Sequence, residues 1–181
     1  MRKLLSLIAV IAAFAMMLTL VGCGGNDKDD EDEKSGKSIH KSAEAVVEAA
    51  VNAMFEGDAD TLIDCFPEFV LEQEFDDIDE AKEDLQDSLD DFLEEGEEYD
   101  WEYRVTVKQT KDKSDDLMEE IEYEFDLSSK ELKSIKEAAK VEYELTIEID
   151  DEENSIEAEV ICVKIDGNWY IMNPGMFGGM F

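Results

Sequence analysis

Basic residues are scarce in this 181-residue sequence, in which 16 lysines and arginines accompany 50 aspartates and glutamates, for a formal net charge of −34. A phosphate backbone requires a basic surface, so this imbalance excludes a nucleic-acid-binding role. A basic partner or a cation fits the composition, and an acidic, water-exposed surface is its ordinary explanation. We expect divalent cations to bind weakly and diffusely, because no stretch has the spacing of a calcium loop.

Histidine is nearly absent as well, since His40 is the only one. We expect His40 to lie outside the folded domain, in a tether that ends at residue 41. Without a histidine in the domain, neither a Ser-His or Cys-His pair nor a histidine-bearing metal site can be assembled there. The sequence therefore predicts no catalytic residue, no metal site and no cofactor.

The N-terminus has the pattern of a secretory signal peptide. Residues 1–3 carry two basic side chains, residues 4–20 are almost wholly apolar, and the small residue Gly22 comes directly before Cys23. The sequence Leu20-Val21-Gly22-Cys23 resembles the lipobox of bacterial lipoproteins. The resemblance implies that residues 1–22 are removed by cleavage between Gly22 and Cys23, and that Cys23 becomes the lipidated N-terminus on the outer face of the cell membrane.

An uncleaved membrane helix is the alternative interpretation of this segment. Residues 4–20 fall short of the roughly 20 residues that span a bilayer, which makes it the second choice. The basic start remains on the cytoplasmic side in both cases, and the rest of the chain is exported. Two or more acyl chains, as in bacterial lipoproteins, give stable attachment.

Cysteine is also scarce, and Cys65 and Cys162 are the two that remain when Cys23 is lipidated. A disulfide between them is permitted outside the cell. Both lie among apolar residues, however, as buried free cysteines often do. We therefore favour two buried free thiols.

Residues 23–41 are expected to form a disordered acidic tether, because the run from Asp27 to Lys34 has no apolar residue to bury. The folded domain is expected over residues 42–172. Its first helix begins at the N-cap Ser42 and ends at Gly57; a short helix capped by Asp58 stops at Pro67, and a longer helix runs from Ile78 to about Gly96.

Strand patterns follow these helices. Apolar and polar residues alternate from Tyr99 to Lys108 and from Val141 to Asp150. A turn is expected over Asp151 to Asn154, and then a strand over about Ser155 to Ile165. Asp166-Gly167 predicts a hairpin that returns through residues 168–172. Residues 114–127 fit either a helix or a strand, and the capping sequence at residues 114–116 favours the helix.

Helices followed by an antiparallel meander indicate an α+β fold. The segments Ser42–Val47, Glu56-Gly57-Asp58 and Lys164–Ile171 resemble the nuclear transport factor 2-like superfamily, above all its secreted bacterial lipoproteins. The resemblance covers residues 42–172 and implies a curved antiparallel sheet that wraps a helix to form a cone with a pocket at its open end. Residues 110–140 are longer than the plain fold needs.

The resemblance leaves three functional hypotheses. Enzymes of the superfamily, such as ketosteroid isomerase and scytalone dehydratase, place an Asp, His or Tyr inside the cone, and a pocket Asp with a Tyr would be the equivalent here. A non-catalytic module that binds a small apolar ligand is the second hypothesis, with a pocket or an ordinary core formed by Met54, Phe66, Trp101, Tyr103 and Tyr143. The third is a domain whose surface meets an envelope protein, aided by the flexible apolar tail at residues 173–181.

Overall fold

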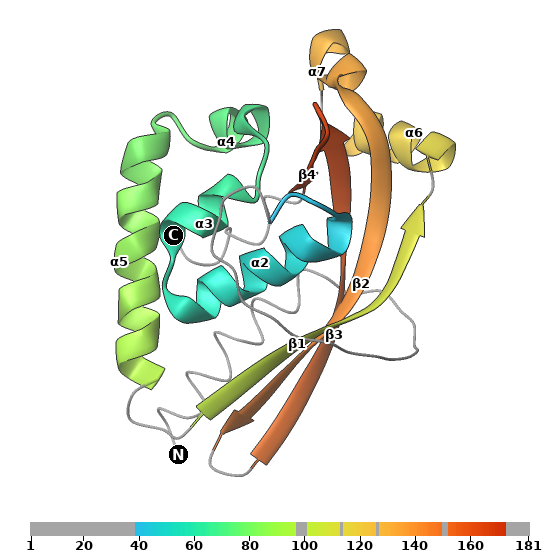
Figure 1. Cartoon of the computed structure of the whole chain (residues 1–181). Helices are drawn as coiled ribbons and strands as arrows, with labels where there is room; N and C mark the ends of the chain where they lie inside the picture. Colours follow the sequence, from blue (N-terminus) through green and yellow to red (C-terminus); the bar gives the residue numbers. More distant parts are fainter. Residues whose placement is uncertain (1–38, 97–100, 113, 126, 150–151, 173–181) are drawn as a thin grey trace.

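Helices form the first half of the folded chain and strands most of the second half. The computed structural model describes residues 39–96, 101–112, 114–125, 127–149 and 152–172 (Figure 1). Within these ranges the elements are α2 (Ala43–Glu56), α3 (Ala59–Asp64), α4 (Glu68–Glu74), α5 (Ile78–Gly96), β1 (Trp101–Asp112), α6 (Ser114–Glu124), α7 (Ser129–Ser134), β2 (Ile135–Ile149), β3 (Glu152–Ile165) and β4 (Asn168–Ile171). The strands form one antiparallel sheet in the order β1-β2-β3-β4, which confirms the α+β class.

Helix α2 has the two ends that the sequence predicts. The Ser42 hydroxyl accepts a hydrogen bond from the Ala45 amide at 3.1 Å, and Gly57 ends the helix in the left-handed conformation with φ 72°. Val46, Val47 and Ala50 are fully buried in α2, which packs against all four strands of the sheet. In Figure 1, α2 lies on the inner side of the bent sheet, so the sheet curves around this helix.

Helix α5 packs on α2 and α3, on the side away from the sheet (Figure 1). Its buried residues Ala81, Leu85 and Leu89 recur at helical spacing, as expected. Gln86 fixes it to the turn between α2 and α3: its Nε2 donates to the Gly57 carbonyl at 2.9 Å, and its Oε1 accepts from the Ala59 amide at 3.3 Å. This side chain joins α5 to the turn that begins α3.

The strands run farther than the alternating pattern indicates. β2 begins at Ile135 rather than Val141, and β3 begins at Glu152, so the expected turn over Asp151–Asn154 was wrong for residues 152–154. Ile149 pairs with Glu152, which is why these residues belong to the ladder. The hairpin at Asp166-Gly167 is confirmed: both residues have positive φ, at 50° and 90°, as the tight turn requires.

Residues 114–124 are helical, in agreement with the favoured interpretation of that ambiguous stretch. Two further helices were missed. The short helix capped by Asp58, α3, ends before Pro67 as expected, and Pro67 then takes the N-cap position of the unexpected helix α4. Helix α7 begins with a capping box in which Ser128 and Glu131 hydrogen-bond each other's backbone amides. Both helices are short, so neither contains enough turns for a clear hydrophobic period.

Two hydrophobic clusters form the core. The first lies between the sheet's inner face and α2, α3 and α5, and includes Val47, Leu85 and Val160. The second lies on the sheet's other face, where Leu117 and Ile121 of α6 meet Val163 of β3. Cys65 and Cys162 are both fully buried and free, which confirms the favoured interpretation of the cysteines.

Several predicted segments lie outside the described residues: the signal peptide at 1–22, the tether up to residue 38 and the tail at 173–181. Among the residues that the structure describes, no helix is long and apolar enough to cross a membrane.

The acidic face of α5 predicts a stability that depends on salt. Glu80 and Asp84, Glu83 and Asp87, Asp87 and Asp91, and Asp90 and Glu94 are like-charge pairs four residues apart. Each pair destabilises the helix by roughly 0.2–0.5 kcal/mol. Lys82, which pairs with Asp60, is the one cation within α5. Screening of about 1 kcal/mol of this repulsion should raise the thermal midpoint by about 2–4 °C.

Calorimetric melting of the protein between low and physiological ionic strength measures this effect. Mg²⁺ and Ca²⁺ should raise the midpoint at lower concentrations than Na⁺, without a saturating tight phase. A midpoint that does not move with salt would refute the repulsion, and tight, saturable Ca²⁺ binding would show that diffuse binding is the wrong description.

Candidate functional site

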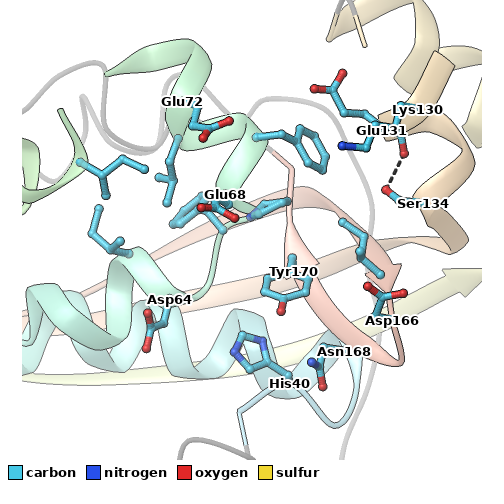
Figure 2. A pocket seen from close by; sticks show the side chains of 17 residues that line it. His40, Asp64, Glu68, Glu72, Lys130, Glu131, Ser134, Asp166, Asn168 and Tyr170 are labelled. Carbon is cyan, nitrogen blue, oxygen red and sulfur yellow. Dashed lines mark hydrogen bonds between the residues drawn. The ribbon is translucent and has the colours of Figure 1, made fainter. Parts of the chain in front are cut away.

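An open cleft lies between the helices α3 and α4 on one side and the β3–β4 hairpin with α7 on the other (Figure 2). Its volume is about 1030 Å³. Its apolar wall comes from both hydrophobic clusters: Ile63, Phe66 and Leu71 belong to the first, and Phe69, Ile165 and Tyr170 to the second. The cleft therefore lies where the two hydrophobic clusters meet.

Backbone hydrogen bonds on the free side of β4 fix one wall of the cleft. β4 pairs with β3 along one edge, and on the other edge the Trp169 amide donates to the His40 carbonyl at 3.1 Å. The Ile171 amide donates to the Cys65 carbonyl at 2.8 Å. These two bonds join β4 to the segment before α2 and to the end of α3, so the two sides of the cleft are held together.

His40 belongs to this wall, which corrects the expectation that it lies in the tether. Its Nδ1 lies 2.8 Å from the Trp169 carbonyl oxygen, and its ring lies 4.7 Å from that of Tyr170. A carbonyl can only accept a hydrogen bond, so Nδ1 carries a proton and donates. The sequence offers no signal for this contact, because it depends on a chain reversal that brings residues 40 and 169 together.

The rim of the cleft is acidic. Asp64, Glu68, Glu72, Glu131 and Asp166 line it, against Lys130 as the lining residue with a full positive charge. Figure 2 shows Asp64, Glu68 and Glu72 along the α3–α4 side, and Asp166 on the hairpin. The Ser128 hydroxyl and amide hydrogen-bond the Glu131 carboxylate and lower its pKa, so this group is anionic at neutral pH.

Of the five side chains suggested as pocket lining, Phe66 lies in the cleft. Met54 and Tyr143 are buried in the first cluster, and burial raises the pKa of Tyr143 to about 12. Trp101 and Tyr103 are half-buried beside Phe55, which stacks on Tyr103 with a ring separation of 4.5 Å. These four side chains pack with other core residues at the inner face of the sheet.

The buried cysteines are unsuited to nucleophilic chemistry. Burial raises the pKa of Cys65 to about 12, and it raises the pKa of Cys162 further. The reactive form of cysteine is the thiolate, which is therefore not populated at neutral pH in either case. Within the described ranges, no group of three or more His, Cys, Asp or Glu side chains is arranged to hold a metal ion.

Neither the models of known protein families nor the curated protein sequences match this chain.

The contacts of the His40 ring with the Trp169 carbonyl and the Tyr170 ring, here called the His40 latch, allow a direct test of the cleft wall. His40→Ala should lower the free energy of unfolding by about 1–2 kcal/mol, because it removes one hydrogen bond and one aromatic contact while the backbone bond to Trp169 remains. Lys41→Ala, at an exposed neighbouring position, should change it by less than about 0.5 kcal/mol. Urea unfolding measures both, and equal values for the two variants would show that the latch does not contribute.

Proposed function

We propose that this protein is a lipid-anchored bacterial envelope lipoprotein whose domain is a non-catalytic binding module of the nuclear transport factor 2-like type. The anchor is Cys23, on the outer face of the membrane. The observation that carries the binding role is the open, mixed apolar and acidic cleft of about 1030 Å³. Ligand sites are concave, largely apolar and equipped with a few polar groups, and this cleft has those properties.

The arrangement of the helices supports the fold assignment. A curved antiparallel sheet that wraps a helix is the arrangement that the sequence resemblance implies, and here β1–β4 curve around α2 (Figure 1). The fit is to the general architecture, while the extra helices α6 and α7 occupy the stretch that is longer than the plain fold needs.

Non-catalytic binding is favoured over the isomerase-like alternative by the environment of the carboxylates. Asp64, Glu68 and Glu72 are exposed at the rim, whereas acid-base catalysis needs a group that is held in a fixed position beside the substrate. In the described part of the chain, the buried charged side chain is Glu142, and it forms an ion pair with Lys111. No specific observation therefore favours a catalytic Asp–Tyr pair.

Replacement of the acyl acceptor tests the anchor. Cys23→Ala should release the protein from the membrane or block its processing, because the lipidated thiol is lost. Fractionation and intact mass measurement of the two versions give the result. Unchanged membrane retention with an uncut N-terminus in both would support the transmembrane alternative instead.

Site-specific photocrosslinking in cells tests the cleft as the binding site. A benzoylphenylalanine at Asn168, in the cleft, should give a discrete adduct by mass spectrometry after illumination. The same probe at Asp84, on the exposed face of α5, serves as the control and should give none. The absence of an adduct at Asn168, or the same adduct from both positions, would contradict a binding role for the cleft.

A further inference from the structure

We propose that the cleft binds a short basic peptide segment that also carries apolar side chains. The proposal rests on the binding function proposed above and adds the chemical class of the ligand. Three features of the cleft support it: its size and openness, its distribution of charge, and its apolar wall. The neighbouring strand edge restricts how such a peptide would bind.

The size and shape of the cleft suit a peptide. Its volume of about 1030 Å³ is just above the roughly 300–1,000 Å³ range of pockets that enclose small molecules. The cleft is also open, with walls from α3–α4, α7 and the β3–β4 hairpin rather than from one continuous element. A cleft of this volume has room for an extended segment of several residues.

The charges around the cleft indicate the sign of the ligand's charge. Three acids, Asp64, Glu68 and Glu72, lie on the α3–α4 side, and Asp166 and Glu131 lie on the opposite side. Among the basic lining residues, Lys130 is exposed and the His40 ring donates its Nδ1 proton to the Trp169 carbonyl. A chain of lysines or arginines along the cleft would therefore meet carboxylates on both sides, whereas an acidic chain would be repelled.

The apolar wall adds selectivity beyond charge. Phe69, Ile165 and Tyr170 are each half-buried at the cleft and lie at the edge of the second hydrophobic cluster. Apolar side chains of a bound peptide would cover this surface and gain the hydrophobic free energy that a purely charged chain does not. A ligand with both kinds of side chain matches the cleft better than a simple cation.

The edge of β4 restricts how the peptide binds. Peptides often add as an extra strand to a free sheet edge. The Trp169 and Ile171 amides on the outer edge of β4 already donate to His40 and Cys65. We therefore infer recognition mainly through side chains in the cleft, rather than through addition of a strand to β4.

Fluorescence anisotropy with labelled eight-residue probes tests the proposal on the full chain in neutral detergent. The three probes alternate lysine with leucine, lysine with serine, and glutamate with leucine. The lysine–leucine peptide should bind at least about tenfold more tightly than the lysine–serine peptide of the same charge. The glutamate–leucine peptide should not bind.

Two charge-matched triple variants locate the site. Asp64→Asn/Glu68→Gln/Glu72→Gln in the cleft should weaken lysine–leucine binding by about tenfold, whereas Glu83→Gln/Asp84→Asn/Asp87→Asn on α5 should change it by less than about twofold. Phe69→Ala should also weaken it, and Tyr123→Ala, at a side chain that is 91% exposed on α6, should not. Thermal melting of each variant separates loss of binding from loss of folding.

The outcomes are distinct. Equal losses in the two triple variants, or equal binding of the lysine–leucine and lysine–serine peptides, would attribute binding to the diffuse acidic field and overturn the proposal. If no basic peptide binds but the Asn168 crosslink forms, this proposal fails and the binding function stands with another ligand. If the crosslink is also absent, both fail.

Discussion

Hydrogen bonding at the outer edge of β4 is the constraint on which the cleft depends. An edge strand presents unpaired amides that would otherwise meet water or another chain. In this protein the amides of Trp169 and Ile171 donate hydrogen bonds to the carbonyls of His40 and Cys65. These two acceptors come from different parts of the helical half of the chain. The same two bonds close the edge and set the spacing between the hairpin and α3, so the cleft walls have a fixed separation.

The large excess of acid shapes the rest of the molecule. Helix α5 stays in place despite the repulsion between the acids on its exposed face. Its residues Leu85 and Leu89 are buried, and Gln86 forms two hydrogen bonds to the turn between α2 and α3. In the sheet, the scarce lysines are placed opposite acids on neighbouring strands, as in Lys108 with Glu144 at 3.1 Å and Lys164 with Glu137 at 2.8 Å. Few cations are left for the cleft, and its rim is therefore strongly acidic.

Local signals predicted the elements that end at special residues. Ser42 and Gly57 fixed both ends of α2, and Asp166-Gly167 fixed the last hairpin, because capping and positive φ depend on residue type alone. The capping box at Ser128 and Glu131 is a local signal for α7, although this helix of six residues is too short to show an apolar period. The long strands were underestimated because both faces of β2 are partly covered near Ala138, which removes the alternation of apolar and polar residues there.

The cleft was predictable only at Phe66, since it is built from contacts between residues far apart in the chain. The latch of His40 on residue 169 and the meeting of two hydrophobic clusters have no local signature.

Native-state hydrogen exchange tests the central claim, that the cleft is preformed, most directly. The Trp169 and Ile171 amides should be protected nearly as strongly as those of β2 and β3. Rapid exchange at both positions, with β2 and β3 still protected, would show that the edge is open and the cleft wall is not fixed.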